Sequence, residues 1–326
     1  MANRYPWQQG IWQQLIDNPR PAHAYLLHGP EGTGKYQLAL ALAKYWLCQQ
    51  PKQQACGQCS SCKLIAADSH PDLLQLLPVE KGKNIVISQV RELVDTIMQT
   101  SQQGGRQVVI IEPAEAMGVA AANALLKSLE EPTKDTYFIL VSHQLGFLLP
   151  TIKSRCLLQR CPLPTTDESQ HWLQQQVAEL TAEQAQQLLQ IAGHSPLLAL
   201  ELAKTDGLAQ RATVVAGVKQ LFKGQATPSD LAGAWAKIPL TLIFAWFAAW
   251  GHELFSFKVT QLPAALSSTD MAVVLGFLAK HAEITEINQT QQWVLAERQK
   301  VLQHVPLRAD LLLESLLIRW QALLRR

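Results

Sequence analysis

Residues 29–36, Gly-Pro-Glu-Gly-Thr-Gly-Lys-Tyr, fit the phosphate-binding loop G-x-x-x-x-G-K-[ST] at every fixed position except the last. In a working loop the backbone N–H groups wrap the phosphates, the lysine reaches the terminal phosphates, and the final hydroxyl holds Mg²⁺. Tyr36 is too long to place its oxygen where a serine or threonine would. We therefore predict a loop that keeps its fold but has impaired nucleotide chemistry. Its candidate phosphate-binding residues are Gly29, Gly32, Thr33, Gly34 and Lys35.

The apolar run 108–111 ends at Glu112-Pro113, where the second half of a nucleotide site would lie. An NTPase of this type has Asp-Glu here, the first carboxylate serving the metal and the second polarising water. Glu112 keeps a carboxylate at the metal position, whereas Pro113 can neither accept a proton nor orient water. We interpret Glu115, two residues further on, as a solvated acid at a helix start. Tyr36 and Pro113 are thus two independent losses at the chemical step.

Two roles remain open for Lys35. It either binds phosphate or is a structural remnant that contacts backbone carbonyls. Weak nucleotide or phosphate binding by the loop is compatible with the first role.

Cys48, Cys56, Cys59 and Cys62 follow the pattern C-x₇-C-x₂-C-x₂-C. Three cysteines at two-residue intervals bring their sulfurs around one point, and a fourth completes the closed tetrahedral shell of a structural Zn²⁺. The simpler alternative is a set of free thiols, and this alternative would be a strong one if the sequence had only a single C-x-x-C. Four closely spaced cysteines favour zinc. His70 is a conceivable alternative ligand, although it precedes a proline and is expected to begin a strand.

Composition limits the remaining function classes. The 28 basic and 26 acidic residues nearly cancel, giving a net charge of +2 without a long basic run, so a large nucleic-acid footprint made by this chain alone is not expected. The start of the chain lacks the features of a signal peptide, and the six cysteines then indicate a reducing compartment. The longest apolar stretch, 238–250, is interrupted by Pro239 and is interpreted as a buried helix rather than a membrane span.

The elements that would position these residues alternate between strands and helices over 1–164, which predicts a doubly wound α/β domain with a parallel sheet. The expected strands are 24–28, 72–77, 108–111, 137–141 and 156–158, and the expected helices are 38–44, 88–100 capped by Ser88, 119–131 and 148–153. The two remaining cysteines, Cys156 and Cys161, lie on or beside the last strand and are interpreted as buried small hydrophobes.

From residue 165 onward only helical patterns are found. Helices at 168–179, 182–192 and 197–203 predict a small helical domain over 165–206. Residues 207–326 are expected to be all helical, and the last helix, 311–324, is apolar on more than one side.

Four segments together resemble the clamp-loader subunits of bacterial DNA polymerase III, which are AAA+ ATPases. They are His-Ala-Tyr-Leu-Leu-His-Gly at 23–29, the four-cysteine insertion, Ala-Asn-Ala-Leu-Leu-Lys-Ser-Leu-Glu-Glu-Pro at 122–132, and Ser-Arg-Cys at 154–156. The degraded nucleotide site and the opening Tyr5-Pro6-Trp7 bring the chain nearest to the subunit of that ring that does not hydrolyse ATP. The resemblance spans nearly the whole chain but is loose at the carboxy terminus.

This resemblance implies three domains: an AAA+ module over 1–164 with a zinc module at 48–62, a lid over 165–206, and a collar over 207–326 that joins five subunits in a ring. It implies that the loader opens the sliding clamp and places it on primed DNA using ATP. Arg155 of the Ser-Arg-Cys triplet would point into a neighbour's ATP site. Leu197 stands where an ATP-sensing arginine would follow the lid's Gly-Ser, which is a third loss. The implied cofactor is structural Zn²⁺, with ATP binding doubtful, and the implied location is the bacterial cytoplasm, away from membranes.

Three alternatives accompany this reading. The chain could be an active ATPase motor of the same ring, which Tyr36 and Pro113 disfavour. It could be a zinc-containing DNA-binding module, which the near-neutral charge disfavours. Arg155 could also be an ordinary surface arginine with no role in trans.

Overall fold

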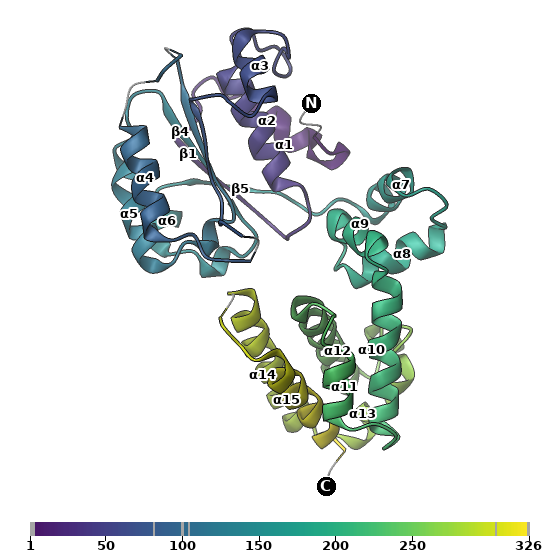
Figure 1. Ribbon diagram of the computed structural model, residues 1–326. Coiled ribbons are helices and arrows are strands. Elements are labelled where there is room, and N and C mark those ends of the chain that lie inside the picture. The colour runs from purple at the N-terminus through teal and green to yellow at the C-terminus, as the bar shows by residue number, and fades with distance from the viewer. Residues whose placement is uncertain (1–3, 81, 99–100, 104, 304, 325–326) are drawn as a thin grey trace. The chain divides into compact units, whose positions relative to one another are not determined.

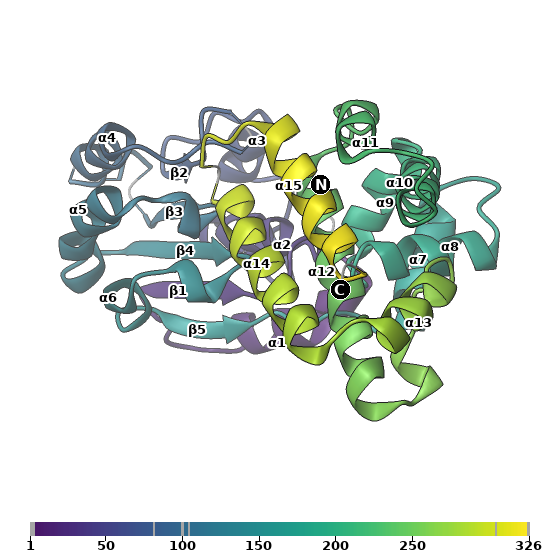
Figure 2. The ribbon, with the colours of Figure 1, turned by 90° about the horizontal axis from the view of Figure 1, so that it is seen from below.

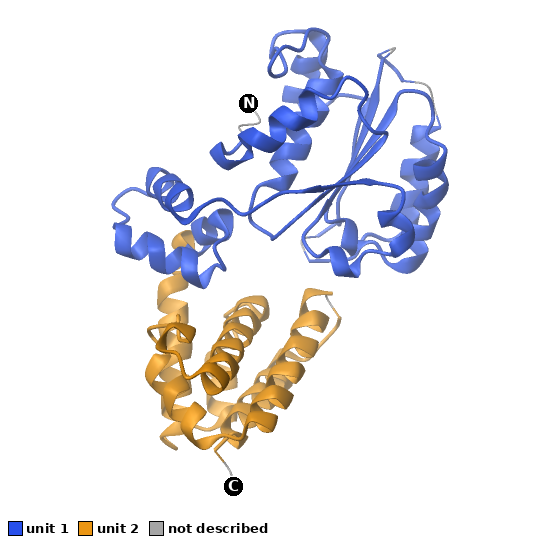
Figure 3. Ribbon diagram, turned by 180° about the vertical axis from the view of Figure 1, so that it is seen from behind, with its two compact units in different colours: residues 1–202 blue, residues 203–326 orange. Residues whose placement is uncertain are grey.

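A computed structural model describes residues 4–80, 82–98, 101–103, 105–303 and 305–324. The chain divides into two compact units, residues 1–202 and 203–326 (Figure 3). The first unit contains all of the strands in the described part of the chain. The second is helical throughout its described residues.

The first unit is built on a five-stranded sheet whose pairings are all parallel, in the order β2-β3-β4-β1-β5 (Figure 2). Leu26 pairs with Leu140 on one side and with Leu158 on the other. The three inner strands are continuous apolar runs because both faces of a parallel sheet are covered by helices. The strands are β1 (Ala24–His28), β2 (Leu73–Leu76), β3 (Gln107–Ile111), β4 (Thr136–Ser142) and β5 (Leu157–Arg160).

Helices cover the two faces of this sheet, and α4 and α5 lie on the face opposite α1 and α2 (Figure 1). One core joins Leu26 and Val109 to Leu125 of α5, and the other joins Leu27 and Val108 to Leu38 of α2. The doubly wound α/β fold is confirmed. The helices are α1 (Gln9–Ile16), α2 (Lys35–Leu47), α3 (Ser60–Ala66), α4 (Ile87–Ile97), α5 (Val119–Glu130) and α6 (Pro150–Lys153), with short 3₁₀ turns η1 (Pro6–Gln8), η2 (Ala114–Ala116) and η3 (Leu145–Phe147).

The start of α4 differs from the prediction. Ser88 was expected to cap this helix, but the N-cap residue is Val86, whose N–H donates to Oε1 of Gln89 at 3.0 Å. A glutamine three residues into a helix can satisfy an N-terminal donor by reaching back. The sequence also predicts a turn at Gly104-Gly105 after this helix. Thr100, the expected last residue of the helix, and Gly104 lie outside the described residues.

Three helices follow the sheet: α7 (Thr166–Gln176), α8 (Ala182–Ile191) and α9 (Pro196–Lys204). The first two begin with capping boxes, in which Thr165 pairs with Glu168 and Thr181 with Gln184. Most of this segment belongs to the same compact unit as the sheet. The three-domain division at 164 and 206 stays a prediction.

The second unit is a bundle centred on tryptophan and phenylalanine side chains. Trp235, Phe247, Trp250 and Trp320 are almost completely buried together. Its helices are α10 (Gly207–Phe222), α11 (Pro228–Ala234), α12 (Leu240–Thr260), α13 (Ala272–His281), α14 (Ile284–Leu302) and α15 (Ala309–Ala322).

By length and composition alone, α12 is long and apolar enough to cross a membrane, which the sequence argument based on Pro239 did not foresee. Half of its apolar window is buried within the protein, where Phe244 and Phe247 lie in the core. The predicted buried helix is therefore present, and it begins directly after Pro239.

Candidate functional site

The phosphate-type loop joins β1 to α2, as the motif requires. Gly34 has a positive φ of 81° and is the N-cap residue of α2, which begins at Lys35. The amino end of α2 therefore faces the loop, and such an end favours anions because its first N–H groups lack helical partners.

The Lys35 side chain is held inside the loop itself. Lys35 is only 2% exposed, and its Nζ donates to the carbonyl oxygen of Pro30 at 2.5 Å. Thr33 Oγ1 donates to the same carbonyl at 3.1 Å. Burial lowers the pKa of the Lys35 ammonium to about 8, although nearby acidic groups, including Glu112, act in the opposite direction. Of the two roles left open by the sequence, these contacts match the structural one.

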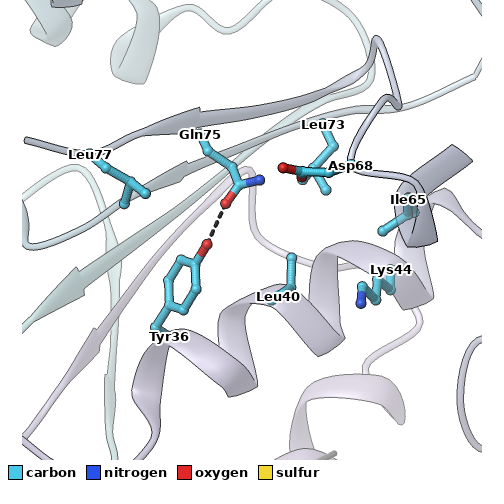
Figure 4. A pocket seen from close by; sticks show the side chains of 8 residues that line it. All are labelled: Tyr36, Leu40, Lys44, Ile65, Asp68, Leu73, Gln75 and Leu77. Carbon is cyan, nitrogen blue, oxygen red and sulfur yellow. Dashed lines mark hydrogen bonds between the residues drawn. The ribbon is translucent and has the colours of Figure 1, made fainter. Parts of the chain in front are cut away.

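The hydroxyl of Tyr36 is engaged by another side chain of the protein. Its hydroxyl donates to Oε1 of Gln75 on β2 (Figure 4). The ring forms part of an open cavity of about 390 Å³ between α2, α3 and β2. The cavity is lined by Tyr36, Leu40, Lys44, Ile65, Asp68, Leu73, Gln75 and Leu77. The phenol therefore supplies a link between α2 and the sheet edge.

Glu112 follows β3 and faces the loop lysine. Burial raises the pKa of the Glu112 carboxyl to about 7, even though Lys35 acts to lower it. Oε1 of Glu112 lies 3.7 Å from Nε2 of His143. Burial, followed by the charge of Lys35, lowers the pKa of the His143 imidazole to about 3, so the ring is neutral at pH 7.

The interpretation of Glu115 as a solvated acid was wrong. Its Oε1 accepts hydrogen bonds from the backbone N–H groups of His143 at 2.7 Å and Gln144 at 3.0 Å. The turn η2 brings Glu115 against the carboxyl end of β4, which the spacing after β3 could not reveal. Oε1 of the carboxylate is thereby occupied in closing that strand end.

The segment after α8 docks directly on the loop. The N–H of Leu197 donates to the carbonyl of Gly32 at 3.0 Å. A Cβ added to Gly32 would lie 2.7 Å from Cγ of Leu198, so only glycine allows this close approach.

The amino-terminal segment covers the other side of the loop. Nε1 of Trp7 donates to the carbonyl of Thr33 at 2.9 Å, and Nε2 of Gln8 donates to the carbonyl of Gly34 at 2.7 Å. The ring of Tyr5 lies so close to Gly34 that a Cβ there would overlap it. The opening Tyr-Pro-Trp motif is thus part of the site.

An aromatic cluster joins this segment to α7. The rings of Tyr5 and Trp7 stack with centroids 4.9 Å apart, and both meet Trp172 edge-on at 5.5 and 5.4 Å. Sequence reasoning missed Trp172, because nothing near it in the chain marks its partner.

The four cysteines converge as predicted. Their sulfurs all lie within 4.8 Å of one another, with Cys48–Cys59 at 4.0 Å and Cys56–Cys62 at 3.9 Å. Four sulfurs at about 2.3 Å from a tetrahedral Zn²⁺ would be about 3.8 Å apart, so the spacing fits a metal ion. Backbone N–H groups also donate to three of the sulfurs, which favours thiolate ligands.

His70 is excluded from this cluster. Its Nε2 hydrogen-bonds Oγ of Ser61 at 2.9 Å, and its Nδ1 accepts from the N–H of Asp72 at 3.1 Å. Both ring nitrogens are therefore used to join α3 to the start of β2. The other two cysteines, Cys156 and Cys161, are buried, as expected.

Arg155 lies in the turn between α6 and β5, at one edge of the sheet. Its Nε donates to Oε1 of Glu130 at 2.7 Å, and its Nη1 donates to the carbonyl of Thr151 at 2.8 Å. The side chain is 28% exposed.

These features define a class of protein. A parallel sheet in the order β2-β3-β4-β1-β5, with a phosphate-type loop after β1 and helices after the sheet, is an AAA+ module. In this chain the lysine of the loop is hydrogen-bonded to the loop's own backbone, and side chains of the amino-terminal segment cover the loop.

Comparisons with known proteins identify the family. Residues 7–163 match the family described as DNA polymerase III, delta subunit, and residues 205–322 match its C-terminal family. The chain belongs to the DNA polymerase III subunit delta' family: it is 48% identical to the Pseudomonas aeruginosa subunit over 99% of both chains. It is also 30% identical to the Escherichia coli subunit, covering 97% of this chain and 94% of that one. A gamma subunit-related protein from Thermotoga maritima aligns over 98% of this chain and 100% of its own, at 20% identity with a TM-score of 0.46.

Proposed function

We propose that this chain is a non-hydrolysing subunit of the DNA polymerase III clamp loader and that it lends Arg155 to the ATP site of a neighbouring subunit. The observation that carries the first half is Tyr36, which replaces the metal-binding serine or threonine of the motif and whose hydroxyl is bound to Gln75. Pro113 and Leu197 add the loss of the water-polarising acid and of the ATP-sensing arginine. Each of these changes removes a different part of phosphoryl transfer, so a single reversion would not restore hydrolysis.

The contacts around the loop support a stator role. In a motor the lid moves when nucleotide binds and leaves. In this chain Leu197 is hydrogen-bonded to the loop, and Trp172 is packed on the amino-terminal rings. A lid fixed in this way makes the first unit a rigid support against which neighbours can move.

The chemistry of the Arg155 side chain supports the second half of the proposal. A guanidinium is always charged and can contact phosphate oxygens through two donors, so it can stabilise the charge that develops during γ-phosphate transfer. Arginine fingers in NTP-hydrolysing systems raise the rate of hydrolysis by about 10³–10⁵-fold. Because the ring has several ATP sites, loss of the finger at one of them would lower the overall rate by less.

We further propose that Cys48, Cys56, Cys59 and Cys62 hold a structural Zn²⁺. The closed set of four thiolates leaves no position for substrate, so the ion would support folding of the insertion and take no part in catalysis. The partners of the chain are the other clamp-loader subunits, in a ring of five in the bacterial cytoplasm, and through them the sliding clamp and primed DNA.

The test is to reconstitute the loader with Arg155→Ala or Arg155→Lys and to measure ATP hydrolysis stimulated by DNA and clamp, together with clamp loading. Both rates should fall while assembly stays normal, and lysine should rescue poorly because it keeps the charge but loses the fork. A Lys35→Ala ring is the control for this chain's own loop and should work normally. A wild-type rate with Arg155→Ala would overturn the role in trans.

A further inference from the structure

The Arg155 guanidinium is ordered within its own subunit by a defined set of contacts. Nε and Nη2 both donate to Oε1 of Glu130, the last residue of α5. On the opposite side, Nη1 donates to the carbonyl of Thr151 at 2.8 Å and lies 3.4 Å from Oγ of Ser154. The guanidinium is therefore hydrogen-bonded to residues of two elements, α5 and α6.

These contacts leave part of the guanidinium available. An arginine side chain has five N–H donors. Glu130 takes the Nε hydrogen and one hydrogen of Nη2, and Thr151 takes one hydrogen of Nη1. One Nη2 hydrogen is left, together with an Nη1 hydrogen that has only the long contact to Ser154. Two donors on the two terminal nitrogens match what a bidentate phosphate contact needs.

Helix stability does not explain an acid at the position of Glu130. A carboxylate in the last turn of a helix lies near the negative end of the helix dipole and is unfavourable there. The next residue, Glu131, offers a comparison: among the described residues, no hydrogen bond or ion pair involves its carboxylate. Of two adjacent acids, one is therefore directed at Arg155 and the other at solvent.

We infer that Glu130 is a positioning residue: it holds the Arg155 guanidinium by its Nε edge so that the free Nη donors face outward for a neighbour's phosphate. This inference rests on the proposed role of Arg155 in trans. Free arginine side chains have many rotamers, and fixing one of them costs entropy. Because Glu130 fixes the side chain before the ring assembles, this entropy is not lost during the chemical step. Removing the Glu130 carboxylate should therefore lower kcat and leave the KM for ATP unchanged.

The experiment compares reconstituted loaders that carry Glu130→Gln with loaders that carry Glu131→Gln as the matched control. The loss of an exposed orienting ion pair should lower kcat by roughly two- to fivefold in the first and leave it unchanged in the second. In an Arg155→Ala background, Glu130→Gln should cause no further fall, because its effect acts through the guanidinium. A merely structural role would instead lower the rate in both backgrounds.

A second readout uses the free chain and does not depend on the ring. The Arg155 Nε–H resonance should be protected from exchange in the wild type and in Glu131→Gln, and lose that protection in Glu130→Gln. Equal protection in all three, or equal kcat for both glutamine variants, would overturn the inference while leaving the arginine finger intact. A wild-type rate for Arg155→Ala would overturn the proposed function and this inference with it.

Discussion

Replacing Lys35 with methionine should stabilise the isolated chain at neutral pH. In the wild type the ammonium is buried, with the Pro30 carbonyl as its one hydrogen-bond acceptor among the described residues. Burial lowers its pKa from 10.5 to about 8. At roughly 1.4 kcal/mol for each tenfold change in acidity, this corresponds to about 3 kcal/mol of destabilisation while the lysine is charged.

The sign of the pH dependence follows from proton uptake. Between pH 8 and 10.5 the unfolded chain binds the Lys35 proton and the folded chain has released it, so wild-type stability rises with pH in that window. Methionine cannot titrate. The advantage of Lys35→Met over the wild type is therefore fully present below pH 8 and should shrink by about 3 kcal/mol by pH 10.5.

Urea unfolding of both proteins from pH 7 to 10.5 measures this difference, and Lys44→Met on the same helix corrects for the loss of one positive charge. A carbon-13 NMR titration of the lysine ε-carbons locates the Lys35 midpoint directly. A difference in unfolding free energy that stays constant across the range, or a midpoint near 10.5, would refute the reasoning that burial in the loop destabilises the charged form of Lys35.

Two further predictions concern the zinc module and the lid. Metal-replete protein should hold one Zn²⁺ per chain by elemental analysis. Cys59→Ser should lose the ion and several kcal/mol of local stability, because the insertion has little apolar core. Cys156→Ala should keep its zinc. Zinc retention by Cys59→Ser would contradict the proposed set of four ligands. Trp172→Ala should lower the free energy of unfolding by about 3 kcal/mol and raise hydrogen exchange in α7 and in the loop, because it removes the ring that joins them. The same change at its exposed neighbour, His171→Ala, should have neither effect. Unchanged exchange in Trp172→Ala would show that other contacts hold the lid.

Local patterns were enough to predict much of this fold. The strand before the phosphate loop was predicted with its observed bounds because a short apolar run between turn signals has few alternatives. The cysteine cluster was also predictable, since C-x-x-C spacing constrains where sulfurs can go. The start of α4 was not, because serine is a favourable N-cap residue by type, whereas the observed start at Val86 depends on Gln89 reaching back to the Val86 N–H.

The parts of the site that escaped prediction depend on contacts between distant segments. Gln75 is far from Tyr36 in sequence, and no rule indicates that a tyrosine in the metal position would seek the sheet edge. Glu115 and Trp172 likewise gain their roles from partners that the fold alone brings close. Glu130 likewise has its partner, Arg155, 25 residues away in the sequence.

The most direct test of the central claim is the ATPase activity of the purified chain, measured with and without primed DNA, against a Lys35→Ala control. The wild type and the control should show the same background rate, because Tyr36 provides no metal-binding hydroxyl and Pro113 no catalytic carboxylate. Turnover that is stimulated by DNA and abolished by Lys35→Ala would contradict the account and identify the chain as a motor.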